Sequence, residues 1–257
     1  GSGGSEDLVD FSPICHFFPM RAGPVLANSI LEESVMTEMS QAVQTDNECA
    51  ENPLPGSVTD TAPAVDLDRE QHYRIGAYGM LAQLLRQSPD QLMLEKVTGF
   101  ATVEPSRDEL ALAMSMLGLS ASDSRPQAVE LEFHDLFIGM GRGELVPYGS
   151  WYLTGFLMEK PLGRLRDDLA MLGFQRQDGV TEPEDHVAAL CEVMAMMIGE
   201  GVGFRQQSHF FESHMAGWLE HFFADLSEAK AAVFYRAVGR FGAAFAAMEK
   251  RYLSMPV

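Results

Sequence analysis

Apolar residues recur at a spacing of three to four from about residue 68 to the end of the chain. Three such stripes stand out. Two of them run through residues 187–198 and 233–248, and the third, which is the clearest, comprises Tyr73, Ala77, Met80, Leu81, Leu84 and Leu85. This spacing is that of amphipathic helices, and no segment alternates with period two for long enough to require a strand. The pattern predicts an all-α fold, a single helical bundle domain of about eight to ten helices over residues 67–257.

Four short motifs predict where helices begin. Pro89 directly after Ser88 is typical of a first helical turn. Three other pairs have the spacing of a capping box, in which two side chains satisfy free backbone N–H groups: Ser106 with Glu109, Ser124 with Gln127, and Thr181 with Glu184. We expect a helix to begin at each of these positions.

The first 66 residues differ from the rest of the chain. Gly1–Ser5 resemble a linker left by cloning, which has no bearing on the fold. Residues 1–66 hold 11 acidic residues and a single basic one, Arg21, and their apolar residues keep no regular period. We expect a largely disordered, acidic extension over 1–66, with the natural start at Met36 or Met39.

Charge and composition exclude several classes of protein. The formal net charge of -19 argues against a nucleic-acid partner and favours a basic ligand. No apolar run approaches the roughly 20 residues of a membrane-spanning helix, and no secretory signal is visible, so we expect a cytoplasmic protein without stable membrane insertion. Cys15, Cys49 and Cys191 are too far apart for a metal motif and are expected to be free thiols, with Cys191 in a helix core.

A first candidate site lies where a helical face meets a glycine-rich break. Phe133, Leu136, Phe137 and Met140 share one face, and the segment Pro147-Tyr148 follows the glycines. The face is either a core stripe or one wall of a groove that accepts the apolar side of a peptide. The residues alone leave both interpretations open.

A second candidate site is the segment from Thr181 to His186. If the capping box starts a helix, Asp185 lies in its first turn, where the helix dipole stabilises a negative charge. An ionised carboxylate at a pocket edge binds a guanidinium well, and His186 could orient it. The alternative is that both residues only cap the helix.

Catalytic chemistry has little support in the sequence. His209, Glu212 and His214 lie close together, but the HExxH arrangement of zinc proteases is absent. The two glycine-rich segments, 139–143 and 199–203, follow no predicted strand, and no Walker lysine is present. We predict no catalytic residues, no metal and no cofactor, and keep a helical metal-dependent hydrolase using this cluster as the enzyme alternative.

Three motifs carry a resemblance to a known family. They are L-F-x-G at residues 136–139, P-Y-x-S-x-Y at 147–152 and E-P-x-D-H at 182–186. Their order and spacing resemble the TorD/DmsD/NarJ family of redox-enzyme maturation chaperones over about residues 68–257. Two features depart from the family pattern: Gly149 stands where many members have a larger residue, and Trp151 adds bulk beside Ser150.

The resemblance implies an all-helical cytoplasmic chaperone. Such a protein binds the twin-arginine signal peptide of a molybdopterin oxidoreductase and delays export until the cofactor is inserted. The client could instead be an enzyme that is never exported, and a homodimer is possible. The implied peptide-binding residues are Phe133, Leu136, Phe137, Pro147, Tyr148, Ser150, Tyr152, Asp185 and His186.

Overall fold

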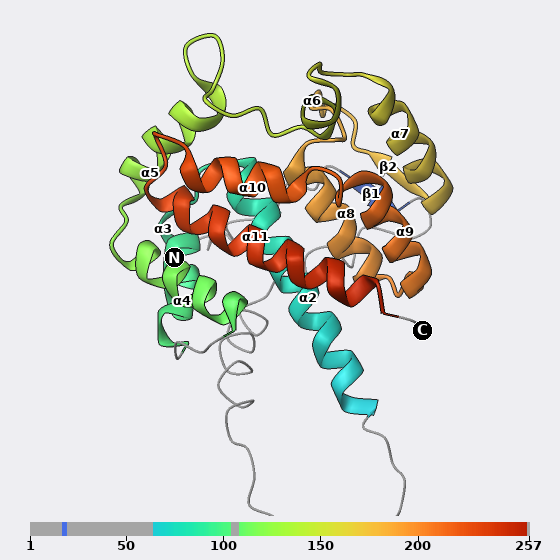
Figure 1. The fold of residues 1–257 in the computed structure, drawn as a ribbon, viewed down its shortest axis with the longest axis horizontal. Coiled ribbons are helices and arrows are strands. Elements are labelled where there is room, and N and C mark those ends of the chain that lie inside the picture. The colour runs from blue at the N-terminus through green and yellow to red at the C-terminus, as the bar shows by residue number, and fades with distance from the viewer. Residues whose placement is uncertain (1–16, 20–63, 104–107, 256–257) are drawn as a thin grey trace, which may run out of the picture.

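The structure is a computed structural model that describes residues 17–19, 64–103 and 108–255. Its helices enclose one core and are joined mostly by short loops (Figure 1). They are α2 (Ala64–Arg86), α3 (Gln91–Thr98), α4 (Glu109–Ser122), α5 (Pro126–Phe133), α6 (Gly149–Thr154), α7 (Lys160–Leu172), α8 (Val187–Gly199), α9 (Phe204–His214), α10 (Leu219–Glu228) and α11 (Phe234–Leu253). The predicted all-α bundle is confirmed. The predicted disordered extension and the natural start lie almost entirely outside the described residues.

Helix α2 forms the centre of the bundle. It packs mainly against α8 and also against α11, so that almost every residue from Arg74 to Leu85 is buried. The predicted apolar stripe is therefore core, and the faces beside it are buried as well. Cys191 lies in the core on α8, as expected, and burial raises the pKa of its thiol to about 12.

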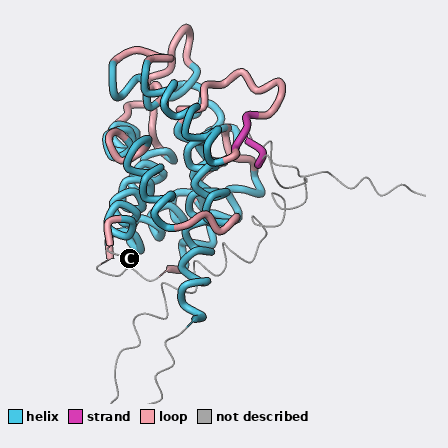
Figure 2. Tube along the Cα trace, turned by 90° about the vertical axis from the view of Figure 1, so that its right-hand side faces the viewer, coloured by secondary structure: helices cyan, strands magenta, loops and turns pink. Residues whose placement is uncertain are grey.

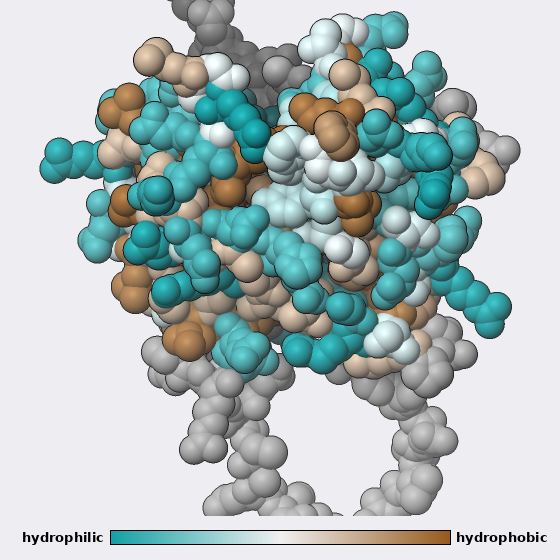
Figure 3. Space-filling view, turned by 45° about the horizontal axis from the view of Figure 1, so that its top comes forward, coloured by the Kyte–Doolittle hydropathy of each residue, from teal (hydrophilic) through white to brown (hydrophobic). Residues whose placement is uncertain are grey.

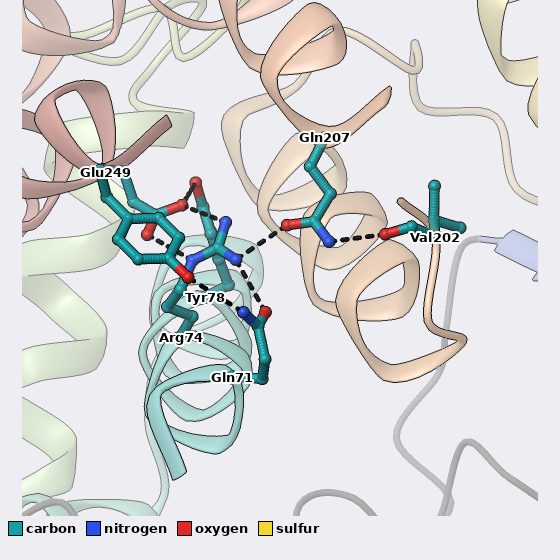
Figure 4. Close-up of polar contacts among 7 residues, drawn as sticks. Gln71, Arg74, Tyr78, Val202, Gln207 and Glu249 are labelled. Carbon is teal, nitrogen blue, oxygen red and sulfur yellow. Dashed lines mark hydrogen bonds and ion pairs between the residues drawn. The ribbon is translucent and has the colours of Figure 1, made fainter. Parts of the chain in front are cut away.

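The burial of Arg74 is compensated by a polar network that joins three helices (Figure 4). Its guanidinium donates to both carboxylate oxygens of Glu249 on α11, at 2.6 and 2.8 Å, and to Gln207 on α9 at 2.8 Å. The Tyr78 hydroxyl donates to the same carboxylate at 2.9 Å. Because both charges are buried, each depends on the other, and the pair fixes α2 against α11.

Two very short strands were not predicted. β1 (Phe17–Pro19) pairs antiparallel with β2 (Phe174–Arg176), with Phe18 opposite Gln175. The pair lies at the edge of the molecule, away from most of the helices (Figure 2). Strands of three residues are too short for a period of two to appear in the sequence.

Two of the predicted helix starts are displaced by neighbouring aspartates. Helix α3 begins at Gln91 with Asp90 as its N-cap, so the prediction from Ser88 and Pro89 is wrong. Asp108 caps α4 by accepting bonds from the two N–H groups of Leu110 and Ala111, whereas Ser106 lies outside the described residues. An aspartate at the N-cap accepts these bonds as well as serine does.

The other two predicted capping boxes are wrong. Helix α5 begins at Pro126 with Arg125 as the N-cap, and the Ser124 hydroxyl donates back to the carbonyl of Ser120 at 2.7 Å. Helix α8 begins only at Val187, so Thr181 and Glu184 precede it and cap nothing.

Among the described residues, no helix combines the length and the apolar character needed to cross a membrane.

Candidate functional site

The structure brings the second and third sequence motifs together. Tyr148 and His186 form an isolated antiparallel bridge. On one side of it the Gly149 N–H donates to the Asp185 carbonyl at 2.9 Å, and on the other the Val187 N–H donates to the Pro147 carbonyl at 2.9 Å. Because these backbone groups are used between segments, residues 182–186 cannot also be helical, and α8 starts after them.

Asp185 is the most unusual polar group of this site. Its side chain is 4% exposed, and Oδ2 accepts a hydrogen bond of 2.7 Å from the Ser150 backbone N–H. The other oxygen, Oδ1, is buried and has no hydrogen-bond partner among the described residues. The predicted place of Asp185 in a first helical turn is wrong, since the helix begins two residues later. A buried carboxylate oxygen without a donor is an unsatisfied acceptor for a cation or an N–H group.

His186 has the capping role that was predicted for Thr181. It is the N-cap of α8, and its Nδ1 accepts a hydrogen bond of 3.1 Å from the Ala188 N–H. The ring also meets the Tyr148 ring edge to face, with centroids 5.0 Å apart. His186 is therefore held by the helix start on one side and by the aromatic motif on the other.

Two glutamates fix the loop that carries Asp185. The Tyr148 hydroxyl donates to Glu182, and burial, reinforced by that bond, raises the pKa of Tyr148 so that the phenol stays protonated. The buried carboxylate of Glu184 accepts from Arg166 of α7 at 2.9 Å and lies 3.6 Å from the Arg176 guanidinium. The Glu184 carboxylate is thus already paired with arginines of the same chain.

Tyr152 and Gly149 pack against the indole of Trp218. The Tyr152 ring stacks on it with centroids 5.6 Å apart, and the Tyr152 hydroxyl donates to Asp225 at 2.9 Å. A Cβ on Gly149 would lie 3.0 Å from the indole nitrogen. The buried Trp218 therefore leaves little room for a side chain at the glycine that departs from the family pattern.

An exposed apolar segment begins in the last turn of α6, and it was not among the predicted site residues. Its exposed side chains, 45–72% accessible, are Leu153, Phe156, Leu157 and Met158. The Met158 N–H donates to the Ser150 Oγ at 3.2 Å, which ties the segment to Asp185 through one residue. The face seen in Figure 3 shows hydrophobic residues in small patches among hydrophilic ones. The sequence feature that could have indicated this segment is the run of three consecutive apolar residues after Gly155.

The residues of the first motif form a separate cluster. Phe133 and Phe137 contact each other and both contact Tyr235 of α11, with ring centroids 5.0–5.9 Å apart. Leu136 is completely buried. In Figure 1, α5 lies at the left edge of the molecule and α6 near the top, right of centre. The predicted site residues therefore divide into two groups instead of lining one groove. One contact links the two regions: the Arg142 guanidinium lies 4.4 Å from the centre of the Trp151 ring.

The histidine cluster shows no metal-binding geometry. His214 is largely buried, and its Nε2 lies 2.6 Å from a carboxylate oxygen of Asp168. Burial lowers the pKa of His214, and the opposing effect of Asp168 is smaller. Among the residues that the structure describes, no three His, Cys, Asp or Glu side chains lie close enough to share a metal ion.

Comparison with known proteins shows similarity to one family. Residues 103–224, which include all three motifs, match the model of the family described as nitrate reductase delta subunit. The chaperone protein TorD of Vibrio cholerae (strain O395) is 29% identical over 133 residues, which cover 48% of this chain and 60% of that protein. Over these residues the chain is similar to the TorD/DmsD/NarJ family. Its match thus spans three fifths of the length of this relative.

Other relatives align over more of their length. The chaperone protein TorD of Vibrio vulnificus (strain CMCP6) is 26% identical over 206 residues, which cover 70% of this chain and 94% of that protein. Among solved structures, a putative redox enzyme maturation protein from Archaeoglobus fulgidus has a TM-score of 0.41 at 17% identity, covering 78% of this chain and 100% of that one.

Proposed function

We propose that this chain is a cytoplasmic chaperone for a molybdopterin oxidoreductase. It binds the N-terminal twin-arginine signal peptide of its client and assists maturation and cofactor insertion before export. Support comes from the family and from relatives that bear the name chaperone protein TorD. The proposed action is binding and not catalysis, and it requires no cofactor of the chaperone's own.

The observation that carries the proposal is the connection between an apolar surface and a buried carboxylate. Ser150 bonds to both: its N–H donates to Asp185, and its hydroxyl accepts from the backbone of Met158. A twin-arginine signal peptide places basic residues beside an apolar stretch. The segment Leu153–Met158 would contact the apolar stretch, and the unpartnered Oδ1 of Asp185 would accept an N–H from an arginine.

The proposed surface differs from the one inferred from the motifs. Tyr148, Tyr152 and Asp185 remain part of it, with His186 and Pro147 shaping the backbone beneath. Ser150 acts from within, since its side chain is fully buried. Phe133 and Phe137 pack against Tyr235, and Leu136 is completely buried. These three residues would support the fold instead of contacting the peptide.

The overall charge fits such a ligand. With a formal net charge of -19, the protein attracts a basic peptide over long range and raises its rate of association. Lysines would profit from this attraction as much as arginines, so selectivity for arginine has to come from short-range contacts.

Calorimetric titration of the full chain tests the proposal, with twin-arginine signal peptides of molybdoenzymes encoded beside its gene. We expect micromolar binding to one peptide, lost when its arginines are replaced by alanine. Phe156→Ser should weaken this binding, while Leu131→Ser, a change at an equally exposed position on α5, should not.

Two results would contradict parts of the proposal. Equal effects of Phe156→Ser and Leu131→Ser would remove the apolar segment from the surface. Absence of binding to every signal peptide, together with co-purification of an apo-enzyme, would favour a client that is never exported. Self-association of the chaperone stays a prediction, which sedimentation of the free protein would test.

A further inference from the structure

Trp151 presents an aromatic face beside the proposed peptide surface, and an arginine of the same chain covers it. Trp151 follows Ser150 in α6, and its ring is partly exposed. The guanidinium carbon of Arg142 lies 4.4 Å from the ring centre, well within the range of a cation–π contact. Arg142 comes from the glycine-rich loop between the first two motifs.

The base of this loop is firmly anchored. The Leu145 N–H donates to the Leu136 carbonyl at 2.8 Å, and the Glu144 carboxylate accepts from the backbone of Lys230 and Ala231 at 2.8 and 3.1 Å. Gly139 has a φ of +57°, and a Cβ there would lie 2.2 Å from the carbonyl oxygen of Arg142. Only glycine therefore allows the loop to fold back and carry Arg142 toward Trp151.

The tip of the loop, by contrast, is weakly held. Within the part of the chain that the structure describes, the backbone N–H groups of Met140, Gly141 and Arg142 donate no hydrogen bond. Met140 is fully exposed, and Arg142 forms no ion pair with a described carboxylate. The cation–π contact with Trp151 is therefore an interaction of the tip in which none of the anchoring groups at the base takes part.

We propose that Trp151 is a binding seat for an arginine of the client peptide, and that Arg142 fills this seat in the free protein. This inference rests on the proposed function and adds a specificity-determining residue to it. The incoming guanidinium replaces an identical group, so the stacking energy is recovered and Arg142 passes into solvent. A lysine recovers less, because its compact, strongly hydrated ammonium stacks less well than a planar guanidinium.

Proton NMR of the two indole N–H groups tests the seat without a client. Trp218 is buried and donates to the His214 carbonyl, so its signal is an internal reference for Trp151. The probes are acetyl-Arg-Arg-amide and acetyl-Lys-Lys-amide, titrated into the full chain. We expect the arginine probe to shift the Trp151 signal, and the lysine probe to need a several-fold higher concentration.

Variants separate competition by Arg142 from a general change of charge. Arg142→Ala should lower the half-saturating concentration of the arginine probe about three- to tenfold. Arg236→Ala, which removes an exposed arginine from α11, should leave that concentration unchanged. Trp151→Leu should abolish discrimination between the two probes, with the unfolding midpoint measured to verify the fold.

Two outcomes overturn the proposal. If Arg142→Ala leaves probe binding unchanged or weakens it, Arg142 does not occupy a competing position. If both probes act equally on wild type, Trp151 selects no guanidinium. If the probes and variants give the expected results but the protein binds no signal peptide, the proposed function is refuted and the arginine-binding role of Trp151 is not.

Discussion

The backbone N–H of Ser150 donates a hydrogen bond of 2.7 Å to Oδ2 of Asp185, 35 residues later in the chain. Ser150 is the second residue of α6, and Asp185 lies directly before the cap of α8. The same serine accepts the Met158 N–H through its hydroxyl. One buried residue therefore sets the position of the carboxylate and of the exposed apolar segment relative to each other.

The role of Asp185 in stability can be tested by two substitutions, one of which removes the hydrogen-bond acceptor while the other retains it. Asp185→Ala leaves the Ser150 N–H buried without an acceptor, and we expect it to lower the free energy of unfolding by about 1–3 kcal/mol. Asp185→Asn retains an acceptor oxygen and should cost clearly less. Urea denaturation measures both. Equal losses would show that the charge, and not the hydrogen bond to Ser150, supports the fold.

The same pair of variants separates folding from binding. Asp185→Asn should still weaken binding of a twin-arginine peptide by about 1–3 kcal/mol, because a charge-assisted bond to a guanidinium is replaced by a neutral one. Calorimetry with the folded variant measures this loss. An unchanged affinity would restrict Asp185 to its structural role.

Gly149 gives a prediction with a built-in control. A Cβ at this position would approach two atoms of the Trp218 indole to 3.0 and 3.2 Å, and that indole is buried and hydrogen-bonded. Gly149→Ala should therefore destabilise the protein by about 1–3 kcal/mol. Gly163→Ala, within helix α7 and with nothing in reach of the new methyl group, should stabilise it by about 0.5–1 kcal/mol.

The helices could be predicted from the sequence because a buried face repeats every three to four residues. The stripe from Tyr73 to Leu85 marks α2 for this reason. What it cannot show is that α2 lies in the centre, since that depends on α8 and α11, which are more than 100 residues away. The predicted helix starts were wrong where Asp90 and Asp108, instead of a nearby serine, are the N-caps. The spacing of residues in the sequence does not decide which of two neighbouring capping residues is used.

The motifs located the two segments of the candidate site but not their geometry. The bridge between Tyr148 and His186 uses backbone groups that a helix over 181–186 would need. The capping-box sequence at Thr181 and Glu184 therefore starts no helix. Phe133 and Phe137 turn toward Tyr235, about 100 residues later, and no local pattern reports that contact. Exposed apolar residues such as Phe156 are missed because a periodic stripe is a signal of burial.

The buried pair of Arg74 and Glu249 predicts a strong asymmetry between single and double variants. Glu249→Leu leaves the Arg74 guanidinium buried with only neutral acceptors, and we expect a loss of about 3–5 kcal/mol in the free energy of unfolding. Arg74→Met combined with Glu249→Leu removes both charges and should recover much of that loss. A double variant as unstable as the single one would show that the network's other bonds, to Tyr78 and Gln207, dominate.

Glu144 predicts a pH dependence at the base of the loop that carries Arg142. Hydrogen bonds from the Lys230 N–H and then from the Ala231 N–H lower the pKa of Glu144 below its ordinary value of 4.5. Since the unfolded chain binds this proton more readily, the stabilisation is complete above pH 4.5 and is lost as the pH falls through the lower folded pKa. The carboxylate is exposed, so the effect should stay below about 1 kcal/mol.

Glu144→Gln reveals this contribution as a difference that changes with pH. The variant should be less stable than wild type at about pH 6, and the gap between their free energies of unfolding should narrow toward about pH 3. Glu130→Gln, an exposed carboxylate on α5 without a described hydrogen bond, controls for the change of charge. A gap that stays constant across this range would mean that the ionised carboxylate of Glu144 does not anchor the loop, and that the backbone bonds to residues 135 and 136 hold its base without that carboxylate.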